Sequence, residues 1–195
     1  FGQGKVATGP IPSTAPYYDP KVLTLYPHDP ARAKALLNEM GLKPKLGGIR
    51  HRFGIMLTPD GGGQMTRGAQ YIKQALAEVG LEAELEATDW PTQQRRSGNW
   101  EFDCDTNSYG EYGDPAIGTS RFYLSSNIRK GVPLTNLQGY VNPEVDRLFT
   151  QAAVAVTRQE AQSCYSRLQR ILTHDVAMVW LYERNCQFFY NRRLK

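Results

Sequence analysis

The sequence predicts an α/β fold in which an open, mixed sheet is flanked by helices. The main observation is a strand-like segment at 52–57, followed by an amphipathic segment at 64–79 and an alternating segment at 81–87. A strand, a helix and a second strand in immediate succession favour two parallel strands joined by a right-handed crossover. Two further capped helices near the end of the chain supply additional cover for the sheet.

The first two helices are predicted by their ends. Asp29 and Pro30 provide an N-cap acceptor and a proline at the first helical position, and Gly41 is suited to end that helix. The second helix spans about 64–79, with apolar residues on one face, and Gly80 ends it.

Two more helices are predicted in the last third of the chain. One begins at Asn142-Pro143, and the other begins at Thr157, which forms a capping box with Glu160. Each carries one apolar stripe at helical spacing. The stripe of the last helix consists of Ala161, Cys164, Tyr165, Leu168, Ile171 and Leu172.

The remaining segments complete the prediction. Residues 100–105 read as a third short strand, the apolar run 176–182 as a strand buried on both faces, and 187–190 as a last strand. The proline-rich segment 1–28 is expected to wrap the surface in extended form. Residues 105–141, rich in Gly, Asn, Ser and Tyr, are expected to form an irregular functional segment.

Size and charge exclude several classes of protein. The chain has 195 residues, 41% hydrophobic and 22% charged, which fits one globular domain and argues against general disorder. Its net charge of +4 is dispersed, so no nucleic-acid-binding face is expected. No apolar run reaches the ~18 residues of a membrane span. The start, Phe1-Gly2, is neither a Met start nor a signal peptide, and we interpret the chain as a mature piece or an excised fragment.

The usual motifs of metal, redox and phosphate chemistry are absent from the sequence. Cys104, Cys164 and Cys186 are far apart, and the first two are expected to be buried, inert thiols. The three histidines are isolated, and there is no serine-hydrolase elbow. The glycines at 61–63 do not lead into a P-loop, and the G-x-G-x-x-A match at 2–7 is attributed to chance. We therefore expect no cofactor and no metal site.

Carboxylates receive two different interpretations. Glu82, Glu84 and Glu86 alternate along one strand and are expected to form its solvated outer face. Glu111 lies in a segment of aromatic and small residues beyond the carboxyl end of a predicted strand, where ligands bind in open α/β sheets. Such a segment can hold an ammonium group. The residues equally allow a plain surface loop in which Asp114-Pro115 caps the next helix.

A series of segments resembles one known family, the family 5 extracellular solute-binding proteins of ABC importers, which includes dipeptide-, oligopeptide- and nickel-binding proteins. No single motif is specific, but their order along the chain is. The matching segments are 7–12 (ATGPIP), 26–37 (YPHDPARAKALL), 74–81 (QALAEVGL), 102–103 (FD), 113–115 (GDP) and 139–146 (GYVNPEVD).

The resemblance implies a two-lobed clamshell of the type II periplasmic-binding-protein class, of which residues 1–195 are the single carboxyl-proximal lobe, without the N-terminal lobe of the same polypeptide. It also implies capture of a peptide or small-molecule solute, delivery to ABC permease subunits in the membrane, and a periplasmic or cell-surface extracellular location. Neither an enzymatic activity nor a nucleic-acid partner is expected.

The resemblance further implies a ligand-binding segment. In peptide-binding members a carboxylate, more often Asp, anchors the α-amino group of the peptide, and that position falls on Glu111. The expected ligand-binding residues are Asn107, Ser108, Tyr109, Gly110, Glu111, Tyr112 and Asp114. The alternatives are a carboxylate-based hydrolase using Asp103, Asp105 or Glu111, and a non-transport sensor or chaperone partner.

Overall fold

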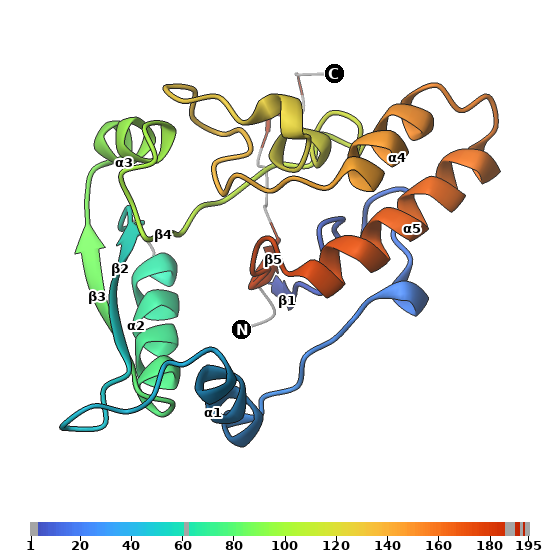
Figure 1. The fold of residues 1–195 in the computed structure, drawn as a ribbon. Helices are drawn as coiled ribbons and strands as arrows, with labels where there is room; N and C mark the ends of the chain where they lie inside the picture. Colours follow the sequence, from blue (N-terminus) through green and yellow to red (C-terminus); the bar gives the residue numbers. More distant parts are fainter. Residues whose placement is uncertain (1–3, 61–62, 186–189, 192, 194–195) are drawn as a thin grey trace. The chain divides into compact units, whose positions relative to one another are not determined.

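The structure is a computed structural model that describes residues 4–60, 63–185, 190–191 and 193 (Figure 1). The chain divides into two compact units. Unit 1 comprises Phe1–Leu25, Glu111–Leu124 and Val141–Lys195, and unit 2 comprises Tyr26–Gly110 and Ser125–Tyr140. Among the helices that the structure describes, none is long and apolar enough to cross a membrane.

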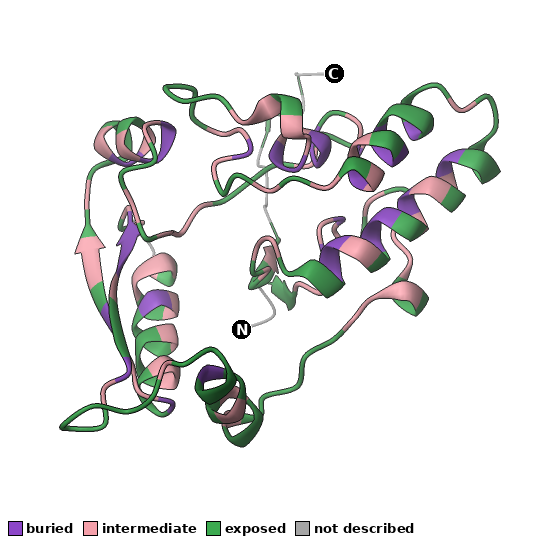
Figure 2. Cartoon of the chain, viewed as in Figure 1, coloured by how far each residue is buried: buried purple, intermediate pink, exposed green. Residues whose placement is uncertain are grey.

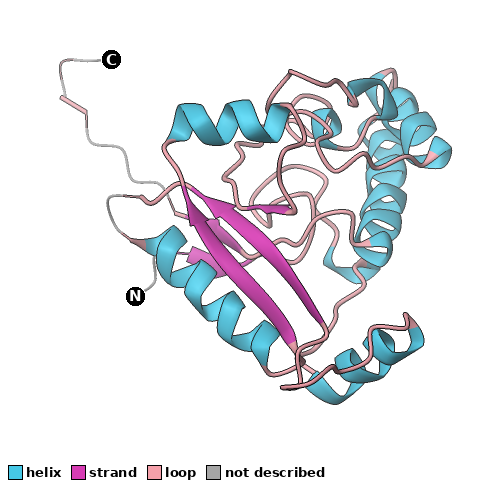
Figure 3. Ribbon diagram, turned by 60° about the vertical axis from the view of Figure 1, so that its left-hand side comes forward, coloured by secondary structure: helices cyan, strands magenta, loops and turns pink. Residues whose placement is uncertain are grey.

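Unit 2 is built around a parallel sheet with the strand order β3-β2-β4 (Figure 3). The strands are β2 (His51–Leu57), β3 (Leu81–Ala87) and β4 (Cys104–Asp105), with Phe53 paired to Ala83 and Ile55 to Cys104. The predicted parallel pair is therefore confirmed. β3 is an edge strand, and its Glu82 pairs with Arg52 of β2 at 2.6 Å, as suits a solvated outer face.

The third strand is shorter than the predicted range of 100–105. The N–H groups of Trp100 and Glu101 donate to the carbonyls of Ser97 and Arg96, which end the preceding helix. This arrangement satisfies the final carbonyls of a helix and places Trp100 at a positive φ of 63°. These N–H groups are therefore not available to a strand ladder, and the pairing begins only at Cys104.

Three helices belong to unit 2: α1 (Pro30–Glu39), α2 (Gln64–Ala77) and α3 (Trp90–Gly98). Asp29 caps α1 by accepting a hydrogen bond from the Arg32 N–H at 2.8 Å, as predicted. Gly80 follows α2 at φ +86°, and a Cβ there would lie 2.6 Å from the Gly48 carbonyl oxygen, so both φ and space require glycine. No bounds were predicted for α3 from the sequence, although Asp89 caps it by accepting a hydrogen bond from the Thr92 N–H.

The core of unit 2 lies along β2, whose second half is buried (Figure 2). Ile55, Met56 and Leu57 are each at most 2% exposed, and α2 packs on β3 and β2. From the predicted apolar face of α2, Ala69 is buried, and Val79 is buried just beyond the end of the helix. The continuous burial of β2 is typical of a central parallel strand.

Unit 1 contains the helices α4 (Pro143–Ala153) and α5 (Arg158–Asp175), which pack against each other. Their predicted caps are confirmed: Asn142 accepts from the N–H of Glu144 at 3.1 Å, and Thr157 forms the capping box with Glu160. The interface buries apolar residues from both predicted stripes. They are Val145, Leu148, Phe149 and Ala152 from α4, and Ala161, Tyr165, Leu168 and Leu172 from α5.

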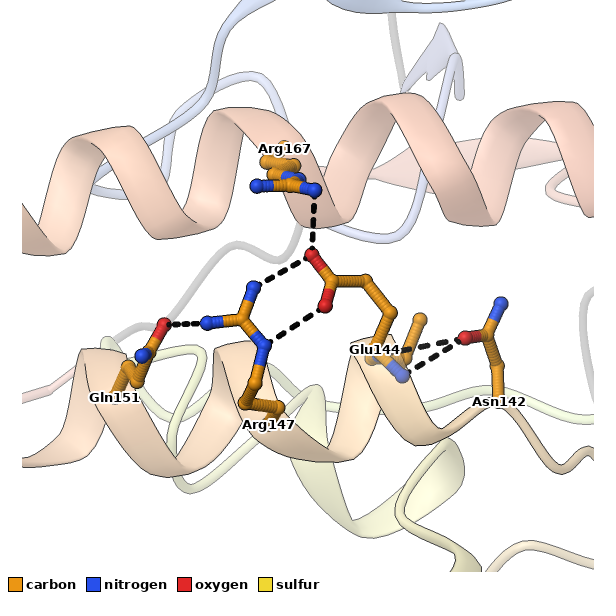
Figure 4. Close-up of polar contacts among 6 residues, drawn as sticks. Asn142, Glu144, Arg147, Gln151 and Arg167 are labelled. Atoms are coloured by element: carbon orange, nitrogen blue, oxygen red, sulfur yellow. Dashed lines mark hydrogen bonds and ion pairs between the residues drawn. The ribbon is translucent and has the colours of Figure 1, made fainter.

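A surface ion-pair group joins the two helices of unit 1 (Figure 4). The carboxylate of Glu144 on α4 accepts hydrogen bonds from Arg147 at 2.7 and 2.8 Å and pairs with Arg167 of α5 at 2.8 Å. Arg147 also donates to Gln151 at 2.7 Å. These hydrogen bonds and ion pairs lower the pKa of the Glu144 carboxyl group.

The prediction of a doubly buried strand at 176–182 is wrong. Val176 ends α5 in the left-handed conformation at φ 50°, and only β5 (Tyr182–Arg184) forms a strand, antiparallel to β1 (Gly4–Val6). Val179 is 74% exposed. An apolar run shows which side chains favour burial but not whether another element covers them. The burial predicted for residues 176–182 was therefore too high. Of the predicted strand 187–190, residues 187–189 lie outside the described residues.

The described part of the proline-rich N-terminal segment runs beside α5, with one short 3-10 helix at Pro20–Val22. Gln169, fully buried, donates to the Tyr17 carbonyl at 2.9 Å, and Ser166 donates to Asp19 at 2.6 Å. Side chains of α5 thus satisfy a backbone carbonyl and a side-chain carboxylate of a segment that has little regular structure of its own. Because Gly4–Val6 is a strand, the glycine match at 2–7 does not lead into a helix.

Candidate functional site

The predicted ligand segment crosses the boundary between the two units, which falls between Gly110 and Glu111. Unit 2 contains Asn107, Ser108, Tyr109 and Gly110. Unit 1 contains Glu111, Tyr112 and Asp114. From the end of β4 to Tyr140 the chain forms no α-helix and no strand; its regular elements are two 3-10 helices, Ser120–Phe122 and Ser125–Asn127. The predicted irregular segment is therefore confirmed.

In unit 1, Thr119 holds the Glu111 carboxylate. The Thr119 Oγ1 atom lies 2.9 Å from Oε1 and 2.7 Å from Oε2 of Glu111, and it also lies 3.3 Å from the Pro10 carbonyl oxygen. Thr119 is only 3% exposed, so its hydroxyl is a fixed donor. The half-buried carboxylate is therefore oriented by a neighbour that is itself well ordered by burial.

The backbone at Glu111 is also constrained. A Cβ at Gly118 would lie 2.0 Å from the Glu111 carbonyl oxygen, so the two main chains approach too closely for any side chain at position 118. Asp114 shapes the chain between them, because its side chain accepts from the Ala116 N–H at 2.8 Å and its carbonyl accepts from the N–H of Gly118. Asp114 thus starts a turn and does not cap a helix, although the surface-loop interpretation of the sequence expected it to cap one.

Burial changes the acidity of the Glu111 carboxyl group. Burial raises the pKa of Glu111 to about 7, the hydrogen bond from Thr119 lowers it in part, and the charges of Asp114 and Arg121 act in opposite directions. On α5, burial and the nearby carboxyl groups of Asp114 and Glu111 raise the pKa of Tyr165. Glu111 is therefore poised to gain or lose a proton near neutral pH.

Aromatic and cationic side chains accompany Glu111 in unit 1. Tyr112 is 68% exposed and has a positive φ of 56°, in a turn that continues to Gly113 at φ 80°. The guanidinium of Arg121 lies 5.1 Å from the centre of the Tyr112 ring and 4.5 Å from that of Phe122. These distances are typical of cation–π contacts.

In unit 2, the predicted residues continue directly from the carboxyl end of β4. Asn107 Oδ1 accepts from the Ser108 N–H at 2.9 Å, while Ser108, Tyr109 and Gly110 are exposed. Gln93 of α3, which is 1% exposed, contacts the same strand end, and neither the bounds of its helix nor its role was predicted from the sequence. The cap at Asp89 with Pro91 was the signal that could have revealed that helix.

Gln93 joins the ends of two strands. Its amide donates to the Asp105 carboxylate and, at 2.7 Å, to the Thr106 carbonyl, and it accepts from Thr58 Oγ1. Burial raises the pKa of Asp105, and the hydrogen bond from Gln93 lowers it in part. Asp103, in turn, accepts from the Gly54 N–H at 2.9 Å. Both aspartates considered for a hydrolase thus serve as acceptors within the framework of unit 2.

The described cysteines and metal-ligating side chains do not form a reactive or metal-binding site. Over the described ranges, no group of three or more His, Cys, Asp or Glu residues is placed to hold a metal ion. Cys104 and Cys164 are half-buried free thiols, and burial, then Asp105 and Asp103, raise the pKa of Cys104. A raised pKa makes a thiol a poor nucleophile at neutral pH, in line with the predicted inert role of Cys104. Cys186 lies outside the described residues.

Known proteins resemble this chain along nearly its whole length. "Probable di/tripeptide-binding protein 5" of Pseudomonas aeruginosa is 28% identical over 181 residues, covering 92% of this chain and 32% of the relative. "Probable D,D-dipeptide-binding periplasmic protein DdpA" of Escherichia coli is 27% identical over 195 residues, covering 100% of this chain and 36% of the relative. The chain therefore spans about a third of the length of these curated relatives.

A solved structure shares the fold. It is the ABC transporter-associated periplasmic binding protein DppA from Helicobacter pylori in complex with the peptide STSA, with a TM-score of 0.78 and 22% sequence identity. The match covers 93% of this chain and 34% of that protein, and it confirms the predicted type II periplasmic-binding fold class.

A family model supplies the remaining comparison. The model described as "Bacterial extracellular solute-binding proteins, family 5 Middle" matches residues 1–130, two thirds of the chain. This agrees with the series of segments that indicated the family in the sequence. The chain belongs to the family 5 bacterial extracellular solute-binding proteins.

Proposed function

We propose that this chain is the carboxyl-proximal lobe of the substrate-binding component of an ABC importer. The whole protein captures a peptide or another amine-bearing solute between two lobes and delivers it to permease subunits in the membrane. It works in the periplasm or at the cell surface. The names of the relatives support this proposal, and so does the chain's length of about a third of theirs.

The observation that carries the proposal is the oriented, half-buried carboxylate of Glu111. A carboxylate that is partly removed from water attracts an ammonium group more strongly than an exposed one does. Burial of such an ion pair is favourable only where hydrogen bonds satisfy the remaining oxygen lone pairs, and Thr119 supplies one. Glu111 is thus suited to receive the cationic end of a solute.

The neighbouring residues complete the proposed binding segment. Tyr112 packs against the solute beside Arg121, which lies over its ring. Asn107, Ser108, Tyr109 and Gly110 supply main-chain donors and acceptors together with one aromatic face. Asp114 keeps the turn after Glu111 in place through its hydrogen bond to Ala116.

The proposed mechanism is capture by closure. The solute makes contacts with both lobes only in the closed state, and this differential contact shifts the population toward that state. No covalent bond forms or breaks, so the protein needs neither a nucleophile nor a general base and is not an enzyme. A hydrolase would instead turn its ligand over, and a stoichiometric complex distinguishes the two functions.

The experiment uses the intact protein. Native mass spectrometry identifies a co-purified solute, and calorimetry then compares that solute with its N-acylated form. Glu111→Gln should weaken binding of the free amine by about tenfold or more, since a charged hydrogen bond is lost. The matched control is Glu101→Gln, an exposed carboxylate paired with Arg95. Equal affinity of wild type and Glu111→Gln for the free amine would contradict the proposal.

A further inference from the structure

A cavity of about 370 Å³ lies in unit 2 at the amino end of β2. Its lining residues are Lys45, Leu46, Ile49, Arg50, His51 and Arg52. Because β2 and β4 are parallel, this cavity lies at the opposite end of the strands from the segment that follows β4. It is therefore separate from the part of the proposed solute segment that lies in unit 2, and it is rich in basic side chains.

Arg50 is the central observation, because its charge is buried without a counter-ion. The residue is 8% exposed, and its Nη1 donates to Asn38 Oδ1 and to the Leu42 carbonyl oxygen, both at 2.6 Å. Both acceptors are neutral. Within the described part of the chain, no carboxylate pairs with Arg50, and its Nε and Nη2 atoms have no acceptor.

A buried guanidinium in this state is energetically costly. Removing an ion from water is unfavourable unless charges and hydrogen bonds compensate. The Asn38 side-chain oxygen and the Leu42 carbonyl oxygen accept hydrogen bonds from Nη1 and so compensate in part. Among the residues described, the Nε and Nη2 atoms of Arg50, which lines the cavity, remain free to donate to a bound molecule. An anion with at least two oxygens would satisfy both at once.

The surrounding residues add positive charge. Lys45 is exposed and contributes a positive charge, whereas Arg52 is already paired with Glu82 at 2.6 Å. Lys45 is held close to the cavity by a tight turn, in which its N–H donates to the Ile49 carbonyl at 2.9 Å. Gly47 and Gly48 make that turn possible at φ values of 83° and 81°.

We propose that this cavity binds a phosphate group. The fork of Arg50 would receive two phosphate oxygens, and Lys45 would neutralise the remaining charge, as guanidinium and ammonium groups do in phosphate sites. The phosphate belongs either to a soluble compound or to a phospholipid headgroup. Leu46, fully exposed at the tip of the turn, is placed to contact the apolar part of a lipid.

The first arm of the test uses inorganic phosphate and the intact protein, with NMR detection of the Arg50 Nε–H resonance. Phosphate should shift this resonance in a saturable way, and Lys45→Ala should weaken binding by about five- to tenfold. Lys34→Ala, an exposed lysine on α1, is the matched control and should leave the affinity within twofold. Equal weakening by both variants would overturn the site in favour of general charge attraction.

The second arm uses vesicles of phosphatidylglycerol and of phosphatidylcholine with the same variants, plus Leu46→Asn. Binding to the anionic vesicles that falls in both Lys45→Ala and Leu46→Asn assigns the phosphate to a lipid. Binding of inorganic phosphate alone, unaffected by Leu46→Asn, assigns it to a soluble compound. If wild type binds neither probe, the proposal is overturned, and this result does not depend on whether an Arg50 variant folds.

Discussion

Thr119 Oγ1 lies 2.9 Å and 2.7 Å from the two carboxylate oxygens of Glu111, in a part of unit 1 where Thr119 is almost fully buried. A single hydroxyl proton cannot satisfy both oxygens at once, so one carboxylate oxygen remains available to another donor. Burial raises the pKa of Glu111 to about 7 despite this hydrogen bond.

The first prediction concerns stability. The folded-state pKa of Glu111 lies above its ordinary value of 4.5. Its contribution to the free energy of unfolding is therefore full below about pH 4.5 and is lost as pH rises through about 7. Wild type should lose on the order of 1–2 kcal/mol across this window relative to Glu111→Gln, less than the full shift implies because solvent screens a partly exposed group. Urea unfolding of both proteins at several pH values checks this, and parallel pH profiles would contradict it.

The second prediction depends on the proposed function: affinity for the solute should rise with pH, whereas stability falls. An ammonium group pairs with the ionised carboxylate, so affinity for an amine-bearing solute should rise between pH 5.5 and pH 8, by about tenfold or more. Calorimetry with the co-purified solute measures this rise. The N-acylated solute serves as the control and should show no comparable rise. A flat profile for the free amine would show that Glu111 does not contact the ammonium group.

The third prediction separates the hydroxyl of Thr119 from its size. Thr119→Val keeps the shape but removes the hydrogen bond that lowers the pKa of Glu111, so that pKa should rise above 7. Thr119→Ser keeps the hydroxyl and should leave the pKa close to that of wild type. Carboxyl ¹³C NMR titration follows Glu111 directly. An unchanged pKa in Thr119→Val would show that the Thr119 hydroxyl is not what positions this carboxylate.

Local sequence signals predicted much of this fold because they act over a few residues. Asp29, Asn142 and Thr157 each satisfy free N–H groups at the start of a helix, and each cap is present as expected. The alternation at 81–87 likewise predicted an edge strand with its glutamates outward. In these elements the neighbouring residues determine the conformation, and the prediction was correct.

Several failures concern partners that lie far away in the sequence. The run at 176–182 is apolar, but whether a second layer covers it depends on distant segments, and here Val179 is largely exposed. Gln93 looks like a surface residue of a polar helix, yet its partners Thr58 and Asp105 come from the ends of two strands. The candidate site shows the same limit, because the segment around Glu111 was found but its partner Thr119 was not.

The last prediction compares two adjacent glutamines of α3. Gln93 donates to Asp105 and Thr106 and accepts from Thr58, so Gln93→Leu leaves several buried polar groups without partners. We expect this change to lower the free energy of unfolding of unit 2 by about 2–3 kcal/mol. The side-chain amide of Gln94 is also buried, but among the described residues it has no hydrogen-bond partner.

Gln94→Leu is therefore a matched control with the same change in composition at the next position. It removes a buried amide that gains nothing from its surroundings, and leucine is at least as good a helix former, so stability should stay the same or increase. Urea unfolding of the two variants, with hydrogen exchange at the β4 amides, measures the difference. If both substitutions lower stability equally, the loss arises from packing in α3 and not from the hydrogen bonds that Gln93 makes to the strand ends.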